Sequence, residues 1–224
     1  MKLLILDTET SGLDPESSHL LEVATAIYSV EHHAVTRARS WLVEAPSNEA
    51  EAINGIPAAL VKADGCDPCY SGKWVQSWAS ECAAIIAYNS DFDRQWFGPM
   101  TVTTPWVDAQ DFAWPRPSAS KSLIAVALAH GIGVASAHRA LADVMILASL
   151  LARAAELGMD VEEQVRRGLR PRALFAVAAT SFDEARNALA KENGFRFDSA
   201  TKTWRRRLAR EDAEKLPFAV REVA

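Results

Sequence analysis

The sequence predicts an α/β fold in which a mixed sheet is flanked by helices and followed by a small C-terminal β/α module. Three observations support this fold class: apolar runs of strand length, intervening segments with apolar residues at helical spacing, and a pattern that starts again after Pro171. The chain has 224 residues and 49% of them are hydrophobic, which is enough for one well-buried domain and a small appendage.

Three consecutive strands are expected at the start of the chain. Residues 2–6 form a nearly unbroken apolar run, which fits a strand buried on both faces, and Asp7 follows at its carboxyl end. Residues 20–30 mix apolar and β-branched side chains and residues 34–43 alternate, so two further strands are expected. A hairpin around residues 31–33 should join them.

The rest of the body is predicted to alternate between helices and short strands. Helices are expected over 49–63, 73–83, 122–130 and 140–156, and short strands over 84–88 and 106–108. The strand over 84–88 places the segment from Asn89 to Asp93 at its end, where ligands gather in open α/β sheets.

A second, smaller pattern begins after the basic stretch 166–171. A strand over 173–178, a helix over 183–192 and two short strands ending near Leu208 are expected there. No internal repeat is visible in the sequence. The sequence therefore predicts one domain over residues 1–168 and a separate small module over residues 172–224.

Charge is distributed unevenly between these two parts. Residues 1–165 contain 10 Lys and Arg against 21 Asp and Glu, whereas residues 166–224 contain 14 against 8. A basic segment next to an acidic body suggests a place for the backbone of a polyanion, so nucleic-acid binding is one interpretation of the module.

Aromatic residues lie among the basic residues of this module. The set consists of Arg196, Lys202, Arg205, Arg206, Arg207 and Arg210 together with Phe195, Phe197 and Trp204. Proteins that bind single strands combine phosphate-neutralising and stacking side chains in this way. The alternative is that the aromatic residues form the small core of the module and the arginines form a solvated face.

Composition indicates a soluble, cytoplasmic protein. No stretch approaches the ~20 apolar residues of a membrane span, and the apolar run at the amino terminus is too short for a signal peptide. Three cysteines give no disulfide framework. Cys66 and Cys69 have zinc-knuckle spacing, but a closed zinc site needs four ligands and no second pair lies nearby, so a turn containing Pro68 is the preferred interpretation.

Three short blocks, residues 7–14, 89–93 and 138–143, supply four acidic side chains and one histidine in a fixed order. Asp7 and Glu9 are two residues apart, so in an extended segment both point to the same side. Magnesium prefers oxygen ligands, and two ions roughly 4 Å apart can hold both the attacking and the leaving oxygen of a phosphoryl displacement. The set therefore predicts a two-metal site that cleaves phosphodiesters, although an Asp-x-Glu pair alone also occurs at solvated strand ends.

The three blocks resemble the Exo I, Exo II and Exo III motifs of the DEDDh (DnaQ-like) 3′-to-5′ exonucleases. Asp7 to Leu13 matches D-x-E-T-T/S-G-L, and His138 to Asp143 matches H-R-A-L-x-D at every specified position. The second block matches H-N-x-x-F-D except that Tyr88 stands where histidine is usual, which affects local packing more than catalysis. Residues 51–56 also resemble the family. The resemblance implies an RNase H-like fold, with strands 1 to 3 antiparallel and the later strands parallel to the first.

The resemblance also implies roles for five residues. Asp7, Glu9 and Asp143 would hold the metal ion that bears the nucleophile, while Asp7 and Asp93 would hold the ion at the leaving group. His138 would act as the general base, because an imidazole titrates near neutral pH. The implied cofactors are two Mg²⁺ ions, for which Mn²⁺ is a substitute.

Substrate contacts follow from the same resemblance. The main chain around Thr10 would contact the terminal nucleotide, Leu13 would wedge beside its base, and Asn89 would help position the strand. Ordinary packing is the alternative for Leu13. Motif spacing selects Asp93 and not Asp91, which is predicted to be an exposed loop acid.

The implied activity is hydrolysis of terminal phosphodiesters of DNA, in single strands or at 3′ ends, with release of nucleoside 5′-monophosphates. The layout of a catalytic domain with a short tail is similar to that of exonuclease X-type proteins. Two alternatives stay open: an RNA 3′ trimmer of the RNase T or oligoribonuclease kind, and a partner-dependent proofreading subunit of a polymerase. No membrane partner is expected.

Overall fold

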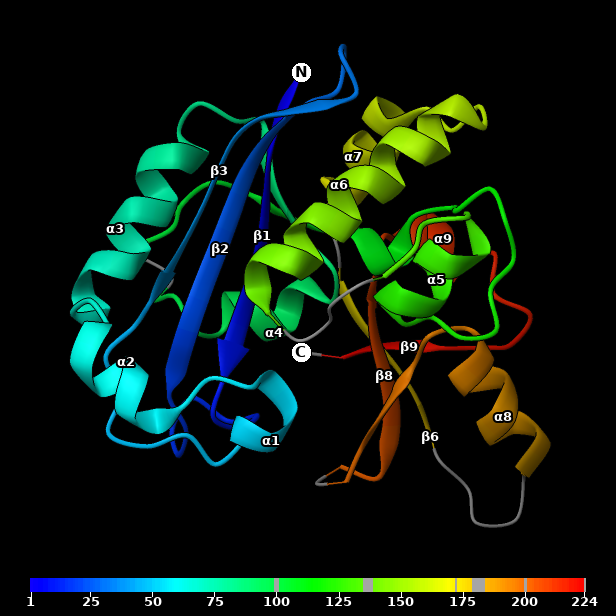
Figure 1. Ribbon diagram of the computed structural model, residues 1–224. Coiled ribbons are helices and arrows are strands. Elements are labelled where there is room, and N and C mark those ends of the chain that lie inside the picture. Colours follow the sequence, from blue (N-terminus) through cyan, green and yellow to red (C-terminus); the bar gives the residue numbers. More distant parts are fainter. Residues whose placement is uncertain (99–100, 135–138, 172, 179–183, 200, 224) are drawn as a thin grey trace. The chain divides into compact units, whose positions relative to one another are not determined.

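The computed structural model describes residues 1–98, 101–134, 139–171, 173–178, 184–199 and 201–223. The chain divides into two compact units, Met1–Leu169 and Arg170–Ala224, each with its own sheet (Figure 1). None of the helices in the described ranges is long and apolar enough to cross a membrane.

The first unit is built on a five-stranded mixed sheet with the order β3-β2-β1-β4-β5. Its strands are β1 (Lys2–Thr10), β2 (Leu20–Ser29), β3 (Ala34–Leu42), β4 (Ala84–Ala87) and β5 (Trp106–Asp108). β1 pairs antiparallel with β2 and β2 with β3, whereas β4 runs parallel to β1 and β5 parallel to β4. The predicted mixed sheet, with three antiparallel strands followed by parallel ones, is confirmed.

Helices of the first unit cover both faces of this sheet. They are α1 (Glu51–Asn54), α2 (Ala58–Asp64), α3 (Pro68–Ala79), α4 (Ser90–Arg94), α5 (Leu123–Ala129), α6 (Ala140–Glu156) and α7 (Val161–Gly168), with a short 3₁₀ turn, η1 (Ala109–Asp111), after β5. α6 lies against β1 and β2 on one face, and α3 lies against the same two strands on the other (Figure 1). The apolar part of β1 is therefore buried on both sides, as its run of apolar residues predicts.

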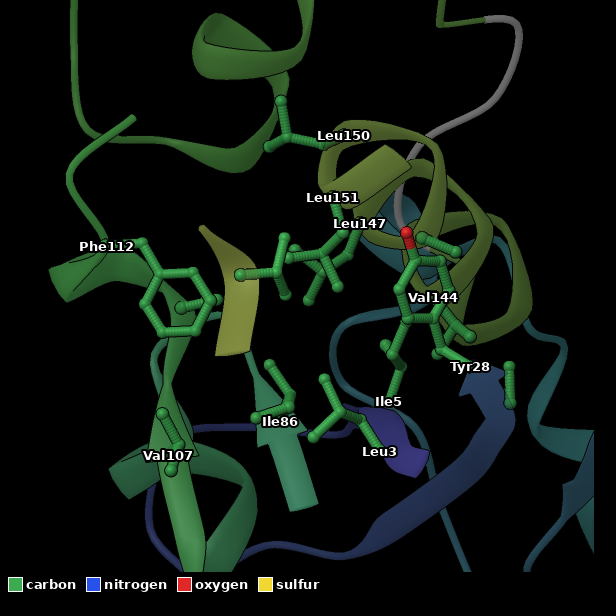
Figure 2. Packing of buried hydrophobic residues seen from close by; sticks show 14 of the residues in the cluster. Leu3, Ile5, Tyr28, Ile86, Val107, Phe112, Val144, Leu147, Leu150 and Leu151 are labelled. Atoms are coloured by element: carbon green, nitrogen blue, oxygen red, sulfur yellow. The ribbon is translucent and has the colours of Figure 1, made fainter. Parts of the chain in front are cut away.

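Alternation along β1 decides which side chains reach which face. Leu3 and Ile5 belong to the core under α6, whereas Leu4 and Leu6 belong to the core under α3. Figure 2 shows side chains of α6 gathered over those of β1 and β4; the labelled residues include Leu3, Ile5, Ile86, Val144, Leu147 and Leu151. Because side chains of a strand alternate, Asp7 and Glu9 continue the row of Leu3 and Ile5 on the α6 face.

β1 is longer than predicted. The expected strand ends at Leu6, but pairing with β2 continues through Thr10, with an irregularity between Glu9 and Thr10. Hydrogen bonding to a neighbouring strand, rather than the loss of apolar character, therefore sets the end of β1. Asp7 lies within the strand and not after it.

The predicted helix over 49–63 is wrong as a single element. Gly55 adopts a left-handed conformation with φ of 65° and ends α1, and its N–H donates to the Glu51 carbonyl. Pro57 then precedes the separate helix α2. Glycine tolerates this conformation without steric cost, so it ends a helix that the apolar spacing alone would continue.

α3 begins at Pro68 and not at residue 73 as predicted. Asp67 caps it by accepting a hydrogen bond from the Cys69 N–H at 2.8 Å, and proline fits the first helical position because its missing N–H would be unsatisfied there. The preferred interpretation of the Cys66–Cys69 segment as a turn containing proline is wrong: Cys66 forms a β-bridge with Val43, and Pro68 and Cys69 belong to the first turn of α3.

The second unit has a four-stranded sheet with the order β7-β8-β6-β9. Its elements are β6 (Ala173–Ala178), α8 (Glu184–Glu192), β7 (Arg196–Asp198), β8 (Thr203–Leu208), α9 (Arg210–Ala213) and β9 (Arg221–Val223). All strand pairs in it are antiparallel. The first four elements were predicted, while α9 and β9 were not, because both are too short to show a period in the sequence.

Candidate active site

Carboxylates from β1 and α6 meet on one face of the first sheet. Ligand oxygens of Asp7, Glu9 and Asp143 all lie within 4.8 Å of one another. β1 supplies the first two at alternate positions, and the first turn of α6 supplies Asp143, whose N–H donates to the Arg139 carbonyl at 3.1 Å. The structure thus brings together three of the four acidic residues that the motifs selected. We call these three residues the acidic cluster.

Burial and mutual repulsion disfavour the charged forms of this cluster. Burial raises the pKa of Asp7 well above its usual range, and the carboxylates of Asp93, Asp143 and Glu9 raise it further. Burial likewise raises the pKa of Glu9 to about 8, with Asp143 contributing and Arg139 opposing the shift. A cation placed among these oxygens would remove the repulsion that raises the pKa of both groups.

Asp93, the fourth predicted acid, lies in α4, outside the acidic cluster but close enough to Asp7 to raise the pKa of that residue. Asn89, two residues after the end of β4, adopts φ of 77°, and this left-handed residue turns the chain into α4, where Asp93 is only 1% exposed. Its Oδ1 accepts a hydrogen bond from Thr8 Oγ1 at 2.8 Å. Burial raises the pKa of Asp93 to about 7, although the hydrogen bond from Thr8 lowers it in part.

Asp91, two residues earlier, is exposed as predicted, but it lies in the first turn of α4 and not in a loop. The contrast with Asp93 supports the choice that motif spacing made between these two acids. It also provides a matched pair of carboxylates for mutation.

Glu22 is a buried acid that sequence reasoning missed. It lies opposite Glu9 in the β1–β2 register and is 2% exposed. Its carboxylate accepts hydrogen bonds from the Arg139 guanidinium at 2.9 and 3.1 Å and from the Ala140 N–H at 3.2 Å. A glutamate of β2 thereby satisfies the first N–H of α6, the helix that carries Asp143. A single acid inside the apolar run 20–28 is the signal that could have pointed to it.

Two other supporting contacts follow from tertiary structure and were not predicted. Asp108 at the end of β5 accepts hydrogen bonds from the N–H groups of Asn89 at 2.8 Å and Gln110 at 2.9 Å, so it helps to fix the turn before α4. Asn54 Nδ2 donates to the Thr10 carbonyl at 3.3 Å and so connects α1 with the end of β1.

The predicted substrate-contacting residues lie around the end of β1 and the start of α4. Thr10 is buried, and its hydroxyl donates to the Gly12 carbonyl at 2.6 Å. Leu13 is 81% exposed, so the alternative of ordinary packing is wrong for its side chain. Gln95, just after α4, donates to the Leu13 carbonyl at 3.1 Å and holds this loop near the helix that bears Asp93.

His138, the predicted general base, lies outside the described residues. Arg139, which follows it, is described and is fixed by the ion pair with Glu22.

Tyr88, which stands where the motif usually has histidine, donates its hydroxyl to the Lys121 carbonyl at 2.9 Å. Its ring packs against the core under α6. Tyr88 therefore takes part in packing near the site, while its effect on catalysis or on strand contact stays a prediction.

The donor set of the acidic cluster suits a divalent cation. Carboxylate oxygens are hard ligands of the kind that Mg²⁺ and Mn²⁺ accept, and the close oxygens of Asp7, Glu9 and Asp143 need a positive charge to be stable together. Among the described residues no group of three or more candidate metal ligands includes Cys66 or Cys69.

Comparison with solved structures reveals the same fold in exonucleases. Exonuclease X, solved in complex with 5′ overhanging duplex DNA, is 25% identical, with a TM-score of 0.59 over 72% of this chain and 96% of that chain. The zinc-bound form of the E. coli exonuclease I complex with single-stranded DNA is 17% identical, with a TM-score of 0.60 over 81% of this chain and 48% of that one.

A 3′-exonuclease solved with the histone mRNA stem-loop is 15% identical, with a TM-score of 0.56 over 70% of this chain and 64% of that one. The chain spans about half the length of E. coli exonuclease I. No curated protein matches the sequence. A family model described as "Domain of unknown function (DUF8626)" matches residues 177–223.

The predicted fold class is confirmed by these matches: the mixed sheet with flanking helices is that of an RNase H-like exonuclease. The predicted enzyme class, a 3′-to-5′ exonuclease, is confirmed by the match to exonuclease X. The individual site residues, the metal ions and the substrate stay predictions.

Proposed function

We propose that this protein is a DEDDh-type, two-metal exonuclease that hydrolyses the terminal phosphodiester at 3′ ends of DNA and releases nucleoside 5′-monophosphates. The observation that carries the proposal is the acidic cluster, whose oxygens from β1 and α6 lie within 4.8 Å of one another. Exonuclease X, which this chain matches over 96% of that protein's length, was solved with DNA, and this favours DNA over RNA as the substrate.

The proposed division of labour follows from the motif resemblance, and the positions of Asp7, Glu9 and Asp143 support the first of the two metal sites. Asp7, Glu9 and Asp143 would hold one divalent cation, while Asp7 and the buried Asp93 would hold a second. Mg²⁺ is the proposed ion and Mn²⁺ a substitute, and such ions supply Lewis-acid activation of the attacking water and neutralise the leaving 3′ oxygen. Thr8 orients Asp93 through its hydrogen bond, and Glu22 with Arg139 orients the start of α6.

Proton transfer is assigned to His138. In this role the imidazole accepts a proton from the water that attacks the terminal phosphorus in line, and it must be neutral to do so. Activity is therefore expected to fall on the acidic side of neutrality. A His138→Ala variant should lose at least about 100-fold in kcat, and full activity of that variant would refute the assignment.

Substrate placement is assigned to three residues near the end of β1. Leu13, an exposed apolar side chain, would wedge beside the terminal base, the main chain around Thr10 would contact the terminal nucleotide, and Asn89 would help position the strand. Gln95 supports the Leu13 loop by its hydrogen bond to the Leu13 carbonyl.

The test is digestion of a 5′-labelled single-stranded DNA oligomer and its RNA copy with Mg²⁺, with Mn²⁺ and with a chelator. A ladder that shortens from the 3′ end and requires a metal ion is expected on DNA. Asp93→Asn and Asp7→Asn should abolish it, whereas Asp91→Asn, an exposed acid of the same segment as Asp93, should not.

Other outcomes would redirect the proposal. Faster cleavage of the RNA copy would assign the protein to the RNA trimmers, a group for which the match to an exonuclease solved with histone mRNA is the supporting observation. No cleavage of either strand, with a stoichiometric polymerase partner in a pull-down, would favour the proofreading subunit.

A further inference from the structure

The sheet of the second unit has two unlike faces. One face is its core, in which Phe175 and Val177 of β6 and Leu208 of β8 pack with Phe195 and residues of α8 and α9. Phe195 is 2% exposed, and the Trp204 indole N–H donates to Asn187 of α8 at 3.0 Å. Two of the three aromatic residues predicted for base stacking are therefore used inside the unit.

Alternation along the strands assigns the other residues to the opposite face. Leu174 and Ala176 of β6 lie on it, as do Arg205 and Arg207 of β8. The strand register adds one arginine from each outer strand. Arg196 of β7 is paired with Arg205, and Arg221 of β9 is paired with Ala176.

Three of these arginines form one row across the sheet, because Arg196 pairs with Arg205, Arg205 with Ala176, and Ala176 with Arg221. Arg207 lies in the neighbouring row opposite Leu174. With strands about 4.8 Å apart, the row spans roughly 14 Å. We call Arg196, Arg205, Arg207 and Arg221 the arginine face.

Like charges at directly opposite positions of a sheet are destabilising. Asp198 is the only acid among the described strand residues of this face, and it forms an ion pair with Arg205 at 3.1 Å. Two arginines outside this face have internal partners: Arg206 donates to the Asn193 carbonyl, and Arg210 forms a bidentate pair with Glu222. The described strand residues of this face thus include four arginines and one acid.

We propose that the arginine face binds the phosphate backbone of the nucleic acid that the first unit degrades; this rests on the proposed function. A row of guanidinium groups matches a polyanion, and each can hold a phosphate through two hydrogen bonds. The side chains between the arginines, Leu174, Ala176 and Val223, are aliphatic, and the register places Phe197 and Trp204 on the other face. The face therefore binds backbone without stacking on bases, so it is indifferent to base sequence.

The test measures binding of the full-length protein to fluorescein-labelled oligo(dT) by anisotropy over a range of NaCl concentrations, with chelator present to prevent cleavage. The double variant Arg207→Gln/Arg221→Gln removes two exposed charges from the face. The control Arg210→Gln/Lys215→Gln removes the same charge from residues that pair with Glu222 and Asp212.

The face variant should bind roughly 5- to 20-fold more weakly near 0.1 M salt, and its slope of log K against log salt should be shallower by about 1.4, since each lost phosphate contact on a single strand contributes about 0.7. The control variant should keep the wild-type slope. A mixed-sequence oligomer should show the same difference. Equal salt slopes for all three proteins, or equal losses of affinity in the face variant and the control variant, would overturn the proposal.

Binding in chelator does not depend on catalysis, so the two proposals fail separately. If the face variant has a shallower slope than wild type but the wild-type protein cleaves nothing, the arginine face is supported and the exonuclease proposal is refuted. If the wild-type protein cleaves normally but the face variant keeps the wild-type slope, the exonuclease proposal is supported and the arginine face is refuted. Thermal unfolding of both variants, with midpoints equal to wild type, ensures that the comparison concerns binding and not folding.

Discussion

Glu22 and Arg139 form an ion pair that joins the second strand of the sheet to the first residue before α6. Two guanidinium nitrogens lie 2.9 and 3.1 Å from the two carboxylate oxygens, and the Glu22 side chain is 3% exposed while that of Arg139 is 46% exposed. The pair is therefore asymmetric. The buried Glu22 carboxylate depends on Arg139 for its negative charge to be stable, whereas the Arg139 guanidinium can be solvated by water instead.

This asymmetry predicts unequal effects of the two neutral variants. Arg139→Gln leaves a buried carboxylate without its cation and should lower the free energy of unfolding by roughly 2 to 3 kcal/mol, somewhat less than for a fully buried pair. Glu22→Gln leaves a solvated guanidinium and should cost about 1 kcal/mol. Urea unfolding of both variants measures the difference, and a larger loss for Glu22→Gln would contradict this account.

The same pair is expected to act on catalysis by positioning α6. Glu22→Gln should lower kcat roughly 10-fold with little change in KM, and a higher Mg²⁺ concentration should be needed for half-maximal rate, because Asp143 follows the helix start. A purely structural role would reduce the amount of folded enzyme without moving the Mg²⁺ dependence. Arg139→Lys keeps the charge but loses the bidentate geometry, so it should recover only part of the rate.

Without metal, the protein should become less stable as pH rises from about 4 to about 8. The pKa values of Glu9 and Asp93 are raised to about 8 and about 7, so in this window the folded state binds more protons than the unfolded chain. The stabilising contribution is complete below the ordinary carboxyl pKa and is lost as pH passes through the raised values. Urea unfolding in chelator at about pH 5, 6.5 and 8 measures this trend, which Glu9→Gln should weaken.

A divalent cation should reverse that trend. Protons and the cation compete for the same carboxylates, so Mg²⁺ should raise the melting temperature more at about pH 8 than at about pH 6. Asp91→Asn should behave like wild type in this measurement, whereas Asp93→Asn should respond less to Mg²⁺. An equal Mg²⁺ effect at both pH values would show that the ion binds elsewhere.

Thr8 is expected to matter through its hydroxyl. Thr8→Val keeps the shape of the side chain but removes the donor that lies 2.8 Å from Asp93, so the rate should fall roughly 10-fold as Asp93 loses its fixed orientation. Thr8→Ser keeps the donor and should retain most of the activity. Equal rates for the two variants would rule out this orienting role.

Asn89 combines a backbone role with a proposed substrate contact, and two substitutions separate them. Asn89→Gly tolerates φ of 77° and should keep wild-type stability, while KM rises several-fold because the side chain is gone. Asn89→Ala should in addition lose about 1 kcal/mol of stability, since a Cβ is disfavoured in the left-handed region. An unchanged KM for Asn89→Gly would limit the residue to shaping the turn.

Sequence alone predicted the elements that repeat a simple period. β2 was predicted from its apolar and β-branched residues and β3 from its alternation, and α6 was predicted with the bounds that it has, because its apolar stripe is long. The helix over 49–63 failed at Gly55, whose backbone conformation outweighs apolar spacing. α7 was missed since only Val161 and Val165 of that segment are fully buried.

Some residues of the candidate site could likewise be selected from short sequence motifs, whereas others could be identified only from tertiary contacts. Asp7, Glu9 and Asp143 could be selected from short motifs, and the structure brings them together. Short motifs could not select Glu22, Thr8 or Asp108. Each of them forms a hydrogen bond to a residue far away in the chain, and the sequence does not specify which distant residues come together. The division of the basic residues into the arginine face and internally paired residues likewise needed the pairing of β6 with β8 and β9.

The alternation of side chains between the two faces of β1 restricts where residues can be inserted or deleted during evolution. Odd-numbered residues of the strand hold the core under α6 and then the two carboxylates, while even-numbered ones hold the other core and Thr8. Insertion or deletion of one residue between Leu3 and Asp7 would exchange the two rows and turn Asp7 and Glu9 away from Asp143. Homologues that keep the activity should therefore tolerate gaps in the β2–β3 turn but none within this strand.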